Sequence, residues 1–143
     1  MRTVTAAALA VVIFLAGALA GTAVSAQRRP AGPQCGSASP QVRTTLYFGL
    51  SKQKGSVSEL EWQMFLRDEV TTRFPDGLTT WEADGQWRGA DGAIGHERSK
   101  VLLLVHPDTP TAKTAVQSVI ERYRKAFEQE SVLWETARVC AAA

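Results

Sequence analysis

The chain has 143 residues, with 16 basic and 14 acidic side chains and a formal net charge of +2. This length suits one globular domain, and a near-neutral charge without a basic run gives no electrostatic basis for binding nucleic acid. The sequence lacks the common motifs of hydrolases, zinc proteases, phosphate-binding loops and calcium loops. We therefore predict no catalytic motif, no metal site and no cofactor.

Residues 1–26 have the organisation of a cleavable signal peptide. Arg2 precedes an apolar stretch at residues 6–20, and small residues then lead to Ala26, after which we expect cleavage. An uncleaved membrane anchor is the alternative, but glycines interrupt the apolar stretch and two arginines follow it. The mature protein is therefore expected to be exported, either secreted or periplasmic, with no membrane segment left after cleavage.

Residues 27–41 are rich in proline, glycine and serine, which predicts an extended lead-in to a single domain at residues 42–140. Cys35 and Cys140 lie near the two ends of the mature chain. In an oxidising compartment a disulfide between them is the default expectation, and two free buried thiols are the alternative.

The first half of the domain begins with an alternating pattern at residues 42–50 that predicts a strand. A helix is then predicted over residues 58–73. Ser58 and Glu61 have the spacing of a capping box, and Trp62 can pack onto the residue before the cap as a hydrophobic staple.

The middle of the domain reads as strands separated by Asp-Gly turns. We predict a strand at residues 78–82, a turn at 84–85, a short strand at 86–88 and a second turn at 91–92. The apolar run at residues 100–107 is the clearest strand of the chain. A short extra hairpin should therefore lie between the second and third core strands.

The last part begins with Thr109, which should cap a helix at residues 110–127, and ends with a strand at residues 131–140. The resulting order is an α+β fold of the ferredoxin-like, split β-α-β kind. Its antiparallel sheet has the order 4-1-3-2, with both helices on one face. This topology brings Cys35 close to Cys140, because the end of the fourth strand lies beside the start of the first.

Several longer stretches of the chain carry a resemblance to a known family. They are RTTLYFGLSK at 43–52, VSELEWQMFL at 57–66, RFPDGLT at 73–79, GQWRGADGAIGHERSKVLLLVHPD at 85–108 and FEQESVLW at 127–134. Together they resemble the family called domain of unknown function 3574, a group of small exported bacterial proteins. The resemblance implies export and the fold, and it transfers no functional residue.

The four tryptophans could form a stacking platform, but packing in the core or the hairpin is the favoured interpretation. Strand parity then predicts which side chains face the helices and which lie on the open face. The set assigned to the helices is Leu46, Phe48 and Leu50 on the first strand, Val101, Leu103 and Val105 on the third, and Leu133, Ala137 and Val139 on the fourth.

Five residues are left to gather on the open face: Arg43, Tyr47, His106, Trp134 and Arg138. Two guanidiniums and an imidazole repel one another unless an anion lies among them, so this cluster predicts a site for a small anionic or aromatic ligand. The alternative is a solvated edge on which glutamates neutralise the arginines and the apolar residues pack under the hairpin or a second subunit.

The leading functional hypothesis is an exported, non-enzymatic binding or interaction module. A second copy of the chain, bound through the open face as a homodimer, is one candidate partner. The rival is a cofactor-free enzyme of the dimeric α+β-barrel kind, with His106 as general base and Arg43 holding an anionic substrate. An inhibitor-like module is the third. The anion site and the enzyme both require Arg43, His106 and Arg138 to share one face.

Overall fold

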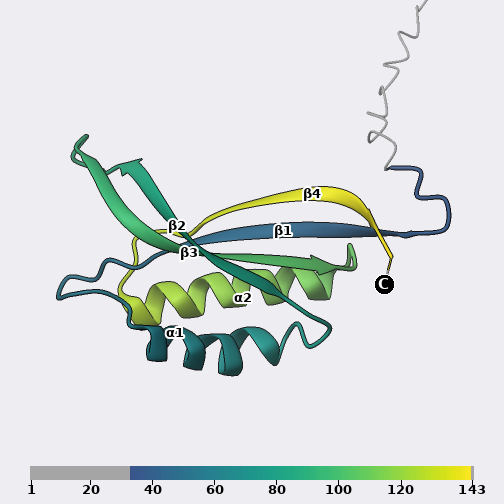
Figure 1. The fold of residues 1–143 in the computed structure, drawn as a ribbon, viewed down its shortest axis with the longest axis horizontal. Coiled ribbons are helices and arrows are strands. Elements are labelled where there is room, and N and C mark those ends of the chain that lie inside the picture. The colour runs from purple at the N-terminus through teal and green to yellow at the C-terminus, as the bar shows by residue number, and fades with distance from the viewer. Residues whose placement is uncertain (1–32, 143) are drawn as a thin grey trace, which may run out of the picture. The chain divides into compact units, whose positions relative to one another are not determined.

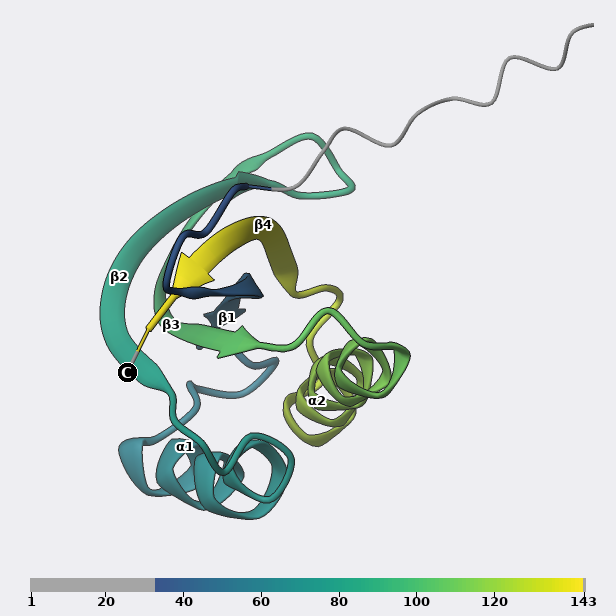
Figure 2. The ribbon, with the colours of Figure 1, turned by 90° about the vertical axis from the view of Figure 1, so that its right-hand side faces the viewer.

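The computed structural model describes residues 33–142, so the predicted signal peptide and its cleavage site after Ala26 lie outside the described residues. The described part has two layers, a four-stranded antiparallel sheet and two helical segments on one of its faces (Figures 1 and 2). The predicted α+β class is confirmed. Within residues 33–142, no helix is long and apolar enough to cross a membrane.

The first helical segment begins as predicted and changes its winding halfway. Helix α1 spans Glu59–Phe65 and continues as the π-helix η1, Leu66–Thr71. The Ser58 hydroxyl accepts a hydrogen bond from the Glu61 backbone N–H, and the Glu61 carboxylate accepts one from the Ser58 N–H, so the capping box is confirmed. The sequence did not predict the π-helical part, because the spacing of its buried side chains, Leu66 and Val70, is compatible with an α-helix as well as with a π-helix.

This cap predicts a pH dependence of stability. A hydrogen bond from Lys52, followed by those from Ser58, lowers the pKa of Glu61 from 4.5 to about 2. A carboxyl with a lowered folded-state pKa stabilises the fold above pH 4.5, and this contribution disappears as the pH falls towards 2. E61Q should therefore be less stable than wild type near neutral pH, and the two should converge on acidification. Urea unfolding across this pH range measures the difference, and a gap independent of pH would contradict the prediction.

The second helix, α2, spans Pro110–Phe127 and has the predicted start. The Thr109 hydroxyl accepts a hydrogen bond from the Ala112 N–H at 3.2 Å, and proline takes the first helical position. The helix ends at Glu128, whose φ of 56° is left-handed. Its buried stripe, as predicted, faces the sheet through Val116, Val119, Tyr123 and Phe127.

The sheet contains β1 (Ser39–Gly49), β2 (Thr79–Arg88), β3 (Ile94–His106) and β4 (Leu133–Ala141). Their order is β2-β3-β1-β4, which reads 4-1-3-2 from the β4 edge. Strand β1 begins before residue 42, where the domain was expected to start, because Ser39 and its two successors pair with the end of β4. The predicted lead-in therefore includes the first residues of the sheet.

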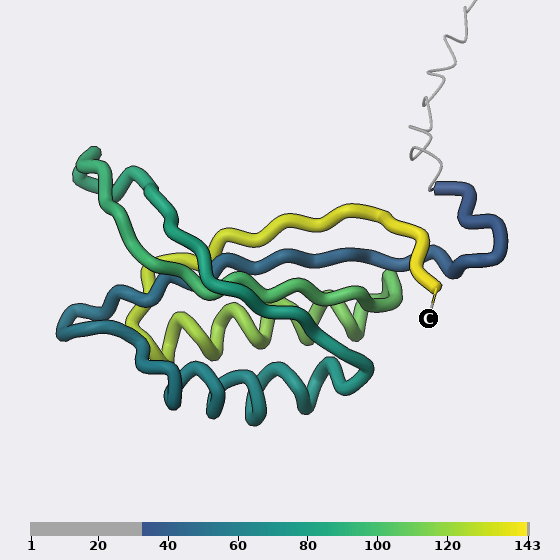
Figure 3. Tube along the Cα trace, in the orientation of Figure 1, coloured from purple at the N-terminus to yellow at the C-terminus, as the bar shows by residue number. Residues whose placement is uncertain are grey.

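The prediction of a separate short hairpin is wrong. Strands β2 and β3 pair continuously from Thr79↔Leu103 to Arg88↔Ile94, so Asp84 and Gly85 lie inside β2 rather than in a turn. The turn is at Asp91-Gly92, where Gly92 has a φ of +82°. One turn there lets the whole of both strands pair, and the resulting long hairpin bends away from the helix layer (Figure 3).

The predicted facing of β1 is confirmed, whereas that of β3 and β4 is wrong by one residue. Leu46 faces the helices as expected, and it pairs with Leu102 and with Trp134. Directly paired residues point to the same face, so the even-numbered residues of β3 and β4 lie on the helix side. The burial agrees at the end of β3, where Leu104 is fully buried and Val105 is 42% exposed. Val101 is buried on the open face, because it lies between Tyr47 and Trp81 of the neighbouring strands.

An aromatic cluster fills the core between the sheet and the helices. The Phe48 ring centroid lies 5.4 Å from that of Trp62, 5.8 Å from that of Phe65 and 4.4 Å from that of Tyr123. The Tyr123 hydroxyl donates a hydrogen bond to the Gly49 carbonyl at 2.8 Å, and burial raises the pKa of this tyrosine. The core role predicted for Trp62 is confirmed.

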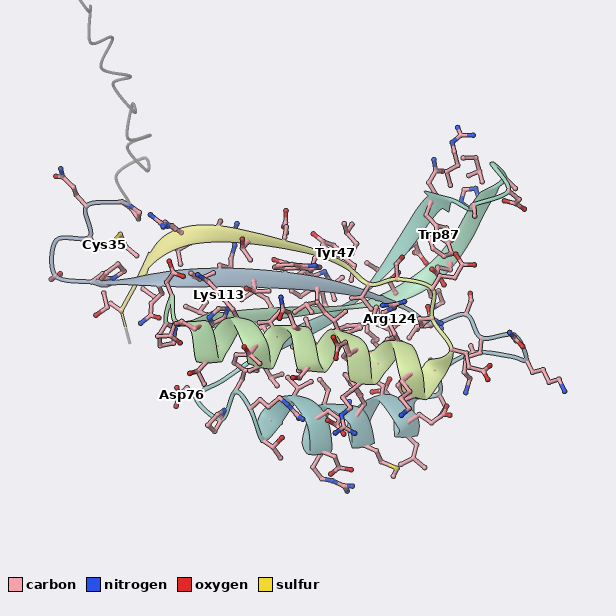
Figure 4. The ribbon with its side chains drawn as sticks, turned by 180° about the vertical axis from the view of Figure 1, so that it is seen from behind. Cys35, Tyr47, Asp76, Trp87, Lys113 and Arg124 are labelled. Atoms are coloured by element: carbon pink, nitrogen blue, oxygen red, sulfur yellow. A yellow bond between two sulfur atoms is a disulfide. The ribbon has the colours of Figure 1, made fainter. Side chains whose placement is uncertain are left out.

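The predicted disulfide is also confirmed. Cys35 and Cys140 are bonded, with their Cα atoms 5.2 Å apart, so the alternative of two free thiols is wrong. Cys140 pairs with Pro40 across the β1–β4 ladder, which brings the two ends of the domain together. Figure 4 shows Cys35 at the end of the domain where β1 begins.

Candidate functional site

The five predicted site residues do not share one face. Val42 pairs with both His106 and Arg138, and Arg43, the next residue along β1, points to the opposite side of the sheet. The predicted cluster of Arg43, His106 and Arg138, which both the anion site and the enzyme hypothesis required, therefore does not form. The open face holds Arg43 and Tyr47, and the helix side holds His106, Trp134 and Arg138.

His106 is a buried, fully bonded side chain, only 5% exposed. Its Nδ1 lies 3.0 Å from the Pro107 carbonyl oxygen and its Nε2 lies 2.8 Å from the Thr44 hydroxyl. A carbonyl only accepts, so Nδ1 carries the proton, and in the neutral ring Nε2 accepts from Thr44. With both nitrogens engaged and Arg43 on the other face, the arrangement predicted for a general base is absent.

A pocket of about 330 Å³ lies beside this histidine, between α2 and β4. Helix α2 supplies one wall, β4 supplies the other, and residues of β1 and β3 form the floor. The polar and aromatic side chains in the lining are Thr44, His106, Asp108, Lys113, Gln117, Trp134, Thr136 and Arg138. Three of the five predicted site residues thus meet here, on the side of the sheet opposite to the one expected.

Two cations and one carboxylate set the charge of the pocket. Lys113 Nζ lies 2.6 Å from one Asp108 oxygen, and Arg138 Nη2 lies 3.6 Å from the other. These three groups carry a net charge of +1. The pocket therefore combines a positive end with the indole of Trp134, which is 45% exposed.

The open face of the sheet is uncovered and largely apolar. No helix lies on this side of the sheet within residues 33–142 (Figure 2). Its most exposed apolar side chains come from three different strands. They are Trp81 on β2, Val105 on β3 and Leu133 on β4, with exposed fractions of 44%, 42% and 68%.

Two of the predicted residues accompany this apolar surface. The Tyr47 hydroxyl donates a hydrogen bond to Glu135 at 3.4 Å, and burial together with this carboxylate raises the pKa of Tyr47. Arg43 forms no ion pair with any side chain in the described part of the chain. The open face therefore carries an unpaired cation and a carboxylate on neighbouring strands.

The interpretation of the tryptophans holds in part, and the α2 wall of the pocket was not predicted. Trp81, Trp87 and Trp134 remain between 41% and 45% exposed and lie outside the buried core, but Trp87 packs over Gly95 within the β2–β3 hairpin, as interpreted. Lys113 and Gln117 were overlooked, although they lie four residues apart beside the apolar stripe of α2. That spacing places both on one side of the helix, next to the sheet.

The two layers, the edge pocket and the uncovered sheet face define a small α+β domain with two candidate binding surfaces. The chain belongs to the family described as "Protein of unknown function (DUF3574)", whose sequence profile matches residues 43–142. The predicted family resemblance is thereby confirmed. No curated protein matches the chain significantly.

Two solved structures share the fold at low sequence identity. A phage SAM lyase in complex with S-methyl-5'-thioadenosine superimposes with a TM-score of 0.53 at 15% identity, covering 71% of this chain and 90% of that one. CutA from Synechococcus elongatus, in complex with a Bis-Tris molecule, gives a TM-score of 0.50 at 13% identity, covering 74% and 87%. At these identities the likeness describes the fold alone.

Proposed function

We propose that this protein is an exported, non-enzymatic interaction domain of ferredoxin-like topology, whose open sheet face binds a second copy of the chain. The observation that carries the proposal is the uncovered face with Trp81, Val105 and Leu133 exposed. An apolar sheet face is normally buried against another layer, and here the second layer exists only on the other side. The disulfide supports export, since such bonds persist in oxidising compartments.

A second copy suits this face because its charges can complement each other. Arg43 and Glu135 lie on the same face of neighbouring strands, and Glu135 accepts a hydrogen bond from Tyr47 but forms no ion pair with Arg43. In a two-fold interface every contact between one residue and another of the partner occurs twice, so Arg43 of each copy can lie opposite Glu135 of the other. The apolar centre and these charges make the face self-complementary.

The substitution L133E tests the proposal. Burying a leucine contributes about 1.5–3 kcal/mol, and a two-fold interface contains this residue twice. The variant should therefore raise the dimer dissociation constant by about a hundredfold or more. Sedimentation equilibrium of the purified protein should show a dimer for wild type and a monomer for L133E at the same concentration.

L60E is the matched control, because Leu60 is 71% exposed, as Leu133 is 68% exposed, but lies on α1 rather than on the sheet. It introduces the same charge and should leave the dimer intact. A wild-type protein that stays monomeric at high micromolar concentration would overturn the proposal, as would equal dissociation of both variants.

A further inference from the structure

We infer that the pocket between α2 and β4 binds a small organic carboxylate with a flat apolar body, held by Arg138 and Lys113 and packed against Trp134. This site lies on the helix side of the sheet, and it is independent of the open face proposed for self-association. Its volume of about 330 Å³ is at the small end of the range for ligand pockets, which suits a ligand of one or two rings.

The pocket exists because the helix layer stops short of β4. The buried core cluster takes side chains from β1 and β3 and, among the described residues, none from β4. Strand β4 is the edge strand next to β1, so its helix-side residues Trp134, Thr136 and Arg138 remain exposed although they face the helix layer. A ligand seated there would take the place of the missing part of that layer.

The positive end of the pocket suits one carboxylate. Asp108 already bridges Lys113 and Arg138, and the net charge of these three groups still leaves one positive charge to balance. The contact of Arg138 with Asp108 uses Nη2 at 3.6 Å, whereas a guanidinium carries five N–H donors in a fork that matches a carboxylate. A ligand carboxylate can therefore join the network without displacing Asp108.

The rest of the lining suits a flat apolar body with few polar atoms. The indole of Trp134 offers a stacking surface at the β4 wall, and the nearly buried Val42 and Val116 offer apolar contact below it. The Thr136 hydroxyl and the Gln117 amide can hydrogen-bond to substituents. His106 supports the floor through its hydrogen bond with Thr44, so it shapes the pocket.

The test uses indole-3-carboxylate and its neutral analogue indole-3-carboxamide, titrated into the purified protein and followed by NMR chemical shifts and calorimetry. The carboxylate should bind with a dissociation constant below about 10 mM, and the amide should bind at least about tenfold more weakly. R138Q and K113Q should each remove most of the preference for the carboxylate over the amide. R138K should keep part of this preference, since lysine retains the charge without the forked N–H donors of a guanidinium. W134A should weaken both compounds alike.

R124Q is the matched control, because Arg124 lies on the same helix in its last turn, at the opposite end from Lys113 (Figure 4). It should leave the affinity of the carboxylate unchanged. Binding should persist in L133E, which separates this site from the open face. Equal affinity of carboxylate and amide, equal losses in R138Q and R124Q, or the absence of shifts at pocket residues would each overturn the inference.

Discussion

Removal of the Cys35–Cys140 disulfide is expected to lower the free energy of unfolding by up to about 4.7 kcal/mol, the value for a closed loop of about 100 residues. The bond joins residues 105 apart in sequence, so in the unfolded chain it restrains nearly the whole domain. It also holds the start of β1 against the end of β4, where Pro40 pairs with Cys140.

The double variant C35S/C140S should be measured by urea unfolding beside wild type, with and without reductant. Reduced wild type should match the double variant, and reductant should leave the variant unchanged. A loss below about 1 kcal/mol would show that the loop is restrained by other contacts in the unfolded state.

Substitution of Phe48 by alanine is expected to cost about 3–5 kcal/mol of folding free energy. Its side chain is completely buried, and its ring contacts Trp62 and Phe65 of the first helical segment and Tyr123 of the second. Truncation removes the apolar area of one ring and leaves a cavity at the junction of sheet and helices, which neighbouring rings can fill only in part.

Leu60→Ala serves as the control for Phe48→Ala, because Leu60 is exposed on α1 and should change stability by less than about 0.5 kcal/mol. Both variants are compared with wild type by chemical unfolding at one pH. A cost near that of the surface control would mean that the core closes around the missing ring, against the expectation from the packed cluster.

The two surfaces proposed here differ in what they require of the fold. The open face needs only that all four strands present their odd-numbered side chains away from the helices. The pocket needs, in addition, that α2 leaves the helix side of β4 uncovered. L133E and R138Q therefore address different parts of the molecule, and the two proposals can fail separately.

Features that depend on neighbouring residues could be predicted from the sequence. The capping box of Ser58 and Glu61 and the start of α2 at Thr109 involve residues three positions apart, so the chain contains both partners in one short window. The disulfide also followed, because the element order places the ends of β1 and β4 together and the sequence has only Cys35 and Cys140 to pair.

The sequence by itself determined the class of the domain, the helix starts and the disulfide, whereas only the tertiary structure decided which side of β3 and β4 faces the helices. In the run KVLLLVH at residues 100–106 the odd-numbered set is wholly apolar, whereas the even-numbered set includes Lys100 and His106, so alternation favours the odd set for the core. The fold buries the even set instead, because Lys100 and His106 find polar partners there, in Glu59 and Glu82 and in Thr44 and the Pro107 carbonyl respectively. The pairing of Leu46 with Leu102 and Trp134 made that choice. Because the even-numbered side chains of β1 face the core, this register places His106, Trp134 and Arg138 on the helix side and Arg43 on the open face. The pocket beside α2 is lined by these three residues of the helix side.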